Sequence, residues 1–257
     1  MKLFRPLRIA LGLLFACVCL GASPARAADS DEQIIAKFKV ESARLQREIH
    51  AAGEDMAKVT DLQKQMQALI ADVTNKVSPK SRAAFEVSMK VINPLMEGGI
   101  TYTSAVQKYI DAGGFDYTSA NTAELIDRRL GQLAELEKLN AALLKRASSL
   151  DTDMDAVLKA SKLSAADKQA FLSGFHSSSA GRLGAIRAVR NLDAKLYVEV
   201  REIYGQLRGQ LGKWSVKGGE LAFDDDAQVA IYNARMERIN VIAERQDAAQ
   251  RRALDIK

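Results

Sequence analysis

Apolar residues alternate at spacings of three and four over residues 31–77, and this pattern predicts a helix with one apolar stripe. Eleven of the stripe's thirteen positions are apolar. Because the register continues through Gly53 without a phase shift, we predict one long helix over 31–77, which Ser30 to Gln33 start as a capping box. A hairpin that breaks at Gly53–Asp55 is the alternative, since glycine is unfavourable inside a helix. The stripe consists of Ile35, Phe38, Ser42, Leu45, Ile49, Ala52, Met56, Val59, Gln63, Met66, Ile70, Val73 and Val77.

Capping residues, prolines and glycines divide the rest of the chain into further helices. Ser78 and Pro79 start a second helix, and Pro94 is expected to kink or end it because proline lacks an amide hydrogen. Glycine pairs at 98–99 and 113–114 then bracket a short piece over 101–112. Three long helices follow, which open at 121–124, at 164 and at about 226. The predicted fold class is all-α: an elongated antiparallel helical bundle with coiled-coil-like long helices.

One helix of this bundle carries a polar residue in its apolar seam. Asn140 lies among the seam residues of the helix that opens at 121–124. A buried asparagine fixes the register between partner helices, whereas one at the edge of the seam reaches solvent. The sequence leaves both readings open.

Residues 214–223 break the helical pattern, because apolar and polar residues alternate on both sides of Gly218-Gly219. Glycines supply the positive φ angles that two-residue hairpin turns require. A turn at this pair places Lys217 opposite Glu220, Val216 opposite Leu221 and Trp214 opposite Phe223. The four apolar side chains then share one face, which helices or a partner must cover. We name Trp214, Val216, Leu221 and Phe223 the hairpin surface. It is the candidate interaction surface of the protein, and we expect it to pack on the bundle and to leave Trp214 at its edge.

The same segment resembles a group of uncharacterised all-helical proteins of the bacterial cell envelope. The resemblance covers about 25 residues and rests on the pattern G-x-W-x-V-x-x-G-x-L-x-F from Gly212 to Phe223, followed by an acidic cap and Tyr232-Asn233. It implies a helical fold and an envelope location, and it carries no known activity.

The N-terminus has the three parts of an export signal: basic residues 1–8, an apolar run over 9–22, and small residues at Ala25 and Ala27. We predict a signal peptide over 1–27 with cleavage after Ala27, and a single helical-bundle domain over 28–257. The apolar run is too short to span a bilayer, and no later stretch qualifies as a transmembrane helix. The protein is therefore expected in the periplasm or outside the cell. Lipid attachment at Cys17 is the alternative.

Removal of residues 1–27 changes the charge and the thiol content. The formal net charge falls from +5 to +1, so the basic balance gives no argument for nucleic-acid binding, and we expect no nucleic-acid partner. Cys17 and Cys19 are the only cysteines, and both leave with the signal peptide. The mature chain then has no disulfide, no thiolate nucleophile and no Cys/His zinc site, and we expect no cofactor.

The remaining candidate chemistry is better explained by structure. Residues 151–155 imitate the start of a calcium loop, but Ala156 and Lys162 occupy its glycine and acid positions, so we interpret the segment as a solvated helix face. We interpret Asp224–Asp226 as a helix cap. The histidines at 50 and 176 lie in no metal or catalytic motif, and we interpret the basic stretch over 182–201 as a solvated face, because acids interleave with it. The sequence therefore predicts no catalytic and no metal-binding residue.

These observations favour an exported, non-enzymatic envelope protein that acts as a helical scaffold, adaptor or chaperone-like binding module. Its partner is expected to be another protein, an envelope component or a second copy of the chain. The first alternative is a membrane-perturbing protein in which residues 87–115, with Tyr102, Tyr109 and Phe115, insert into a bilayer; we expect this region to be core instead. The second alternative is a hydrolase without a recognisable motif.

Overall fold

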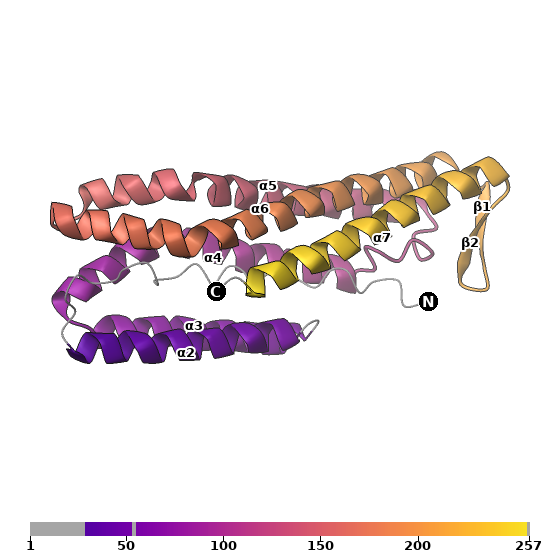
Figure 1. The fold of residues 1–257 in the computed structure, drawn as a ribbon. Helices are drawn as coiled ribbons and strands as arrows, with labels where there is room; N and C mark the ends of the chain where they lie inside the picture. The colour runs from indigo at the N-terminus through magenta and orange to yellow at the C-terminus, as the bar shows by residue number, and fades with distance from the viewer. Residues whose placement is uncertain (1–28, 53–54, 256–257) are drawn as a thin grey trace.

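The computed structural model describes residues 29–52 and 55–255, and almost all of them lie in long helices (Figure 1). A two-stranded hairpin separates the last two helices, so the predicted all-α fold with one β-hairpin is confirmed. In Figure 1, α5, α6 and α7 run along one side of the elongated molecule, and α2 and α3 lie on the other. The elements are α2 (Asp29–Ala52), α3 (Met56–Lys76), α4 (Pro79–Asp111), α5 (Ala123–Ala160), α6 (Ala165–Gly209), β1 (Trp214–Lys217), β2 (Glu220–Phe223) and α7 (Asp226–Asp255).

The prediction of one helix over 31–77 is wrong, because the chain forms two helices that lie side by side (Figure 1). The first ends at Ala52, and Asp55 caps the second by accepting a 3.0 Å hydrogen bond from the backbone N–H of Lys58. The stripe itself is buried in both helices, from Phe38 and Leu45 in α2 to Met66 and Val73 in α3. One apolar stripe serves a hairpin as well as a long helix, because each arm turns its apolar side towards the other.

Helix α4 also differs from the prediction, because it continues through Pro94 and through Gly98-Gly99 to Asp111. The chain is buried on two sides at this point: Leu95 belongs to the core cluster shared with α5 and α6, and Met96 to the cluster shared with α2 and α3. This packing outweighs the unfavourable local preferences of proline and glycine. A Cβ at Gly98 would lie 3.0 Å from Cδ2 of Leu143, so the glycine permits the close approach of α4 to α5.

The start of α4 is joined to α2 by a buried carboxylate. Ser78 caps the helix as predicted, and Asp31 of α2 accepts hydrogen bonds from the backbone N–H of Ser78 (2.9 Å) and from the hydroxyls of Ser78 and Ser81. Burial alone would raise the pKa of Asp31, but these hydrogen bonds outweigh it and hold the pKa below its usual value. Asp31, which the sequence placed in the cap of its own helix, thus stabilises the cap of another.

The long helices α5 to α7 follow the sequence pattern closely. Thr122 caps α5 and Ser164 caps α6, in each case by accepting a hydrogen bond from a backbone amide three residues further on.

In the part of the chain that the structure describes, no helix has both the length and the apolar character needed to cross a membrane.

Candidate functional site

The hairpin between α6 and α7 has the predicted register. Trp214 lies opposite Phe223, Val216 opposite Leu221 and Lys217 opposite Glu220. Gly218 and Gly219 have φ angles of 59° and 82°, the left-handed conformation that a two-residue type I′ turn requires at both positions. The sequence therefore sets both the turn and the pairing of the strands.

The base of the hairpin is anchored to the bundle. The indole N–H of Trp214 donates a 3.0 Å hydrogen bond to the carbonyl oxygen of Leu207 in α6. The ring of Phe223 lies 5.8 Å from that of Tyr232 in α7, measured between centroids. Trp214, Leu221 and Phe223 are all partly buried against the main core cluster. At its base, each strand of the hairpin is thus held by the helix that flanks it.

The tip of the hairpin is free of these contacts. Residues 215–220 are all exposed, and Val216, the fourth member of the hairpin surface, is 43% exposed. In Figure 1 the two strands project from one end of the bundle. The structure thus places three of the four predicted surface residues partly against the bundle and the fourth towards solvent.

A buried polar cluster that sequence reasoning missed lies inside the bundle. The guanidinium of Arg190 is 2.9 Å from the carboxylate of Asp193, and both side chains are less than a tenth exposed. The hydroxyl of Tyr102 in α4 donates to Asp193 (3.0 Å), and the amide of Gln246 in α7 donates to the other carboxylate oxygen. The hydroxyls of Tyr102 and Tyr197 are hydrogen-bonded to each other, and Arg190 stacks 4.5 Å over the Tyr102 ring. The cluster therefore joins α4, α6 and α7.

The interpretation of the basic stretch as a solvated face is wrong for Arg190 and for the acid next to it in this cluster, Asp193. A salt bridge three residues apart within one helix satisfies both charges in the interior, where an unpaired charge would be very costly. Asn140, whose position the sequence left open, is buried, and its side-chain amide donates a 2.8 Å hydrogen bond to the backbone carbonyl of Arg190. The spacing of Arg190 and Asp193 was the only signal in the sequence, and it gave no sign of the partners on other helices.

Burial sets the protonation of the cluster. It raises the pKa values of Tyr102 and Tyr197, so both phenols stay protonated and act as hydrogen-bond donors at neutral pH. The pKa of Asp193 is also raised by burial, against the opposing effect of Arg190. Because the charged groups are enclosed and paired, the arrangement holds α4 against α6 and adds one hydrogen bond to α7.

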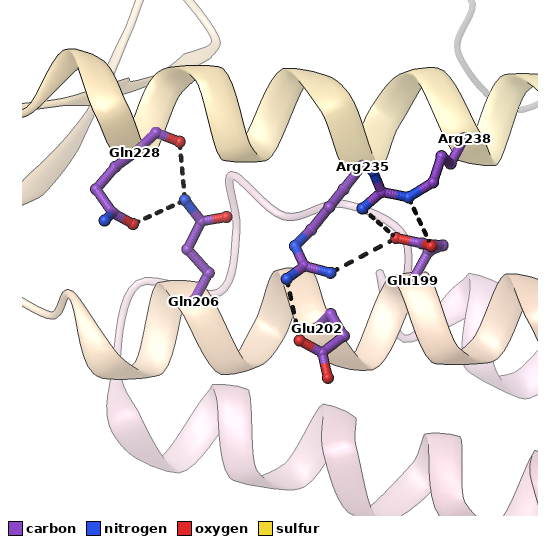
Figure 2. A network of polar contacts seen from close by, with 6 residues as sticks. All are labelled: Glu199, Glu202, Gln206, Gln228, Arg235 and Arg238. Atoms are coloured by element: carbon purple, nitrogen blue, oxygen red, sulfur yellow. Dashed lines mark hydrogen bonds and ion pairs between the residues drawn. The ribbon is translucent and has the colours of Figure 1, made fainter.

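A second set of polar contacts joins α6 to α7 nearer the surface (Figure 2). Glu199 accepts two hydrogen bonds from Arg238, at 2.8 and 3.0 Å, and lies 3.6 Å from Arg235. Arg235 also donates to Glu202 at 3.0 Å. The side-chain amide of Gln206 donates to the backbone carbonyl and to the side-chain oxygen of Gln228, at 2.8 and 3.0 Å. We name these six residues, all labelled in Figure 2, the polar ladder.

The other residues singled out in the sequence have structural surroundings. The calcium-like segment 151–155 lies within α5, and Asp225 caps α7 by accepting a 2.9 Å hydrogen bond from the backbone N–H of Ala227. His176 lies 3.7 Å from Asp151 at the surface. No group of three or more potential metal ligands occurs among the residues described.

Tyr102, Tyr109 and Phe115 are buried in the main core cluster, as expected of a core region. The predicted cleavage site at Ala27 and the alternative lipid site at Cys17 lie outside the described residues.

Comparison of the chain with models of protein families, with curated proteins and with solved structures found no match.

Proposed function

We propose that this protein is an exported, non-enzymatic protein of the cell envelope whose helical bundle acts as a scaffold for a protein-binding hairpin. In this role the bundle supports the hairpin. The hairpin surface, together with the exposed tip residues 215–220, is the adaptor or chaperone-like binding element. The export signal over 1–27 supports the location.

The observation that carries the proposal is the contrast between the two ends of the hairpin. Its base is fixed by the hydrogen bond from Trp214 to Leu207 and by the contact of Phe223 with Tyr232. Its tip is exposed and presents Val216. A binding element that is already ordered loses little conformational entropy when a partner docks, so this construction favours association.

The chemistry of the tip indicates the kind of partner. Both edges of the two-stranded sheet are unpaired within the described chain, and an extended segment of another protein can add to such an edge through its backbone. Val216 offers an apolar contact, and Lys217 and Glu220 offer one charge of each sign. We therefore propose a protein segment in extended conformation as the partner.

A photo-crosslinking amino acid at position 216 tests this proposal in the envelope of the source cell. The matched control carries the same amino acid at Val198, an exposed valine of α6 that is 53% accessible. We expect a discrete protein adduct from position 216 and none from position 198. The absence of an adduct at 216, or the same adducts from both positions, contradicts a binding role of the hairpin.

A further inference from the structure

Helix α7 is attached to the bundle by an unusually polar interface. The buried side chains described for this helix are Ile239, Ile242, Gln246 and Gln250, so half of its buried positions are glutamines. Tyr232, Met236 and Ala249 add partly buried contacts. The polar ladder supplies much of the remaining interface with α6.

The departure of α7 breaks the hydrogen bond from Gln246 to Asp193 and the contact of Tyr232 with Phe223. The Arg190–Asp193 pair and the bond from Trp214 to Leu207 do not involve α7 and remain. Helix α7 is the last helix of the described chain, it packs mainly on α6, and the polypeptide links it to α6 through the hairpin. In Figure 1 it lies along the outside of the molecule, with no element covering its outer side. The main core cluster retains contributions from α4, α5 and α6 in its absence.

The polar ladder places acidic side chains on the face of α6 and basic side chains on the facing side of α7. Glu199 and Glu202 lie on α6, whereas Arg235 and Arg238 lie on α7. Arg238 is half exposed, so salt in the medium screens its attraction to Glu199. Burial of the two isoleucines adds an apolar contribution that salt does not weaken.

From these contacts we propose that α7 is a displaceable strap, and that the α6 face beneath it docks a basic amphipathic helix of a partner. The strap opens as a unit while α4, α5 and α6 stay folded. The chain's own α7 defines the chemistry of the occupant: two arginines three residues apart that meet Glu199 and Glu202, next to two isoleucines three residues apart. This docking face is separate from the hairpin surface.

Hydrogen exchange followed by mass spectrometry on the unaltered full chain tests the opening. We expect α7 amides to exchange faster than those of α6. A rise in NaCl from 0.05 to 1 M should speed exchange in α7 by about fivefold, and in α5 by less than about twofold, because salt screens the half-exposed Arg238 and Glu202 of the ladder. Equal protection of α6 and α7 at every salt concentration overturns the proposal.

Binding of a synthetic peptide of residues 226–252 tests the docking face. The double variant R235Q/R238Q weakens the strap but leaves the acidic face intact, so it should bind the peptide about tenfold more tightly than the unaltered chain. The double variant E199Q/E202Q also frees the strap but removes the acids, so it should bind the peptide about tenfold more weakly than R235Q/R238Q. The control Arg201→Gln breaks an ion pair between α6 and Glu137 of α5 and should leave peptide binding unchanged.

Exchange in α5 of each variant reports whether the bundle is folded. A folded R235Q/R238Q variant that binds no peptide, or equal binding by both double variants, overturns the docking face. If a double variant fails to fold, the salt dependence of exchange in the unaltered chain still decides whether the strap opens.

Discussion

Replacement of Asp193 by leucine is expected to destabilise the protein strongly, because it leaves Arg190 buried without its counter-charge. The carboxylate accepts hydrogen bonds from Tyr102 and Gln246 in addition to the 2.9 Å contact with the guanidinium. Removal of one partner of a buried ion pair costs about 3–5 kcal/mol, mainly through the unpaired charge that remains. An exposed pair such as Arg201 with Glu137 contributes about 0.2–1 kcal/mol, so its disruption is the matched control.

The sign of the coupling identifies the mechanism. Arg190→Met alone leaves the carboxylate unpaired and should also cost about 3–5 kcal/mol. The double variant, Asp193→Leu with Arg190→Met, removes both charges, so its loss of stability should be smaller than the sum of the two single losses. We expect it to fall short of that sum by about 2 kcal/mol. Urea unfolding followed by circular dichroism measures the four free energies. Single-variant costs below about 1 kcal/mol that add without coupling would refute the reasoning, since they are typical of a solvated pair.

Three further predictions concern the core, the α4 cap and the N-terminus. Leu45→Ala should lower the free energy of unfolding by about 2–5 kcal/mol, because the side chain of Leu45 is 1% exposed. The control Val40→Ala should lower it by less than about 0.5 kcal/mol, because Val40 is 70% exposed. Equal losses of the two variants in urea unfolding would show that the stripe is not the core. The lowered pKa of Asp31 means that its stabilising contribution is complete above about pH 5 and is lost as the pH falls through the folded pKa. The stability difference between the unaltered chain and Asp31→Asn should therefore shrink on acidification, and growth of that difference would contradict the account. The intact mass of protein recovered from the envelope should correspond to an N-terminus at Ala28; a lipid-modified N-terminus earlier in the chain would contradict cleavage there.

The sequence predicted the buried stripe of α2 and α3 but not the connectivity of the two helices. The positions of Leu45 and Met66 inside the core follow from the three-and-four spacing, which is the same in one long helix and in two arms that face each other. The local signals at Gly53–Asp55 left the choice open, and tertiary contacts that the sequence does not show, such as the bond from Ser78 to Asp31, favour the two-helix form.

The error at Pro94 has a related cause. Local preferences correctly identified the helix starts at Ser78 and Ser164, where a capping side chain satisfies nearby amides. Within α4 they failed, because burial on two sides holds the helix through the proline, and because Gly98 permits close packing on Leu143 rather than ending the helix. Sequence patterns were reliable at the capped helix ends and unreliable where two cores meet.

The two candidate sites differ in the same way. The hairpin lies within ten consecutive residues, so the alternation about Gly218-Gly219 was sufficient to predict its turn and its register. The buried cluster assembles Tyr102, Arg190 and Gln246 from three helices. Its parts are separated by more than fifty residues. Arg190 and Gln246 each resemble an ordinary polar surface position, and Tyr102 resembles an ordinary core aromatic.

The most direct test of the proposed function is the crosslinking yield from Lys217 at the hairpin tip, with and without the substitution Val216→Asp. Both positions are exposed, and the emission of Trp214 at the anchored base reports whether the hairpin remains folded. The account predicts a protein adduct from position 217 that disappears in the Val216→Asp variant while the Trp214 emission is unchanged. An adduct that persists at the same yield in the folded variant would contradict the hairpin as the binding element.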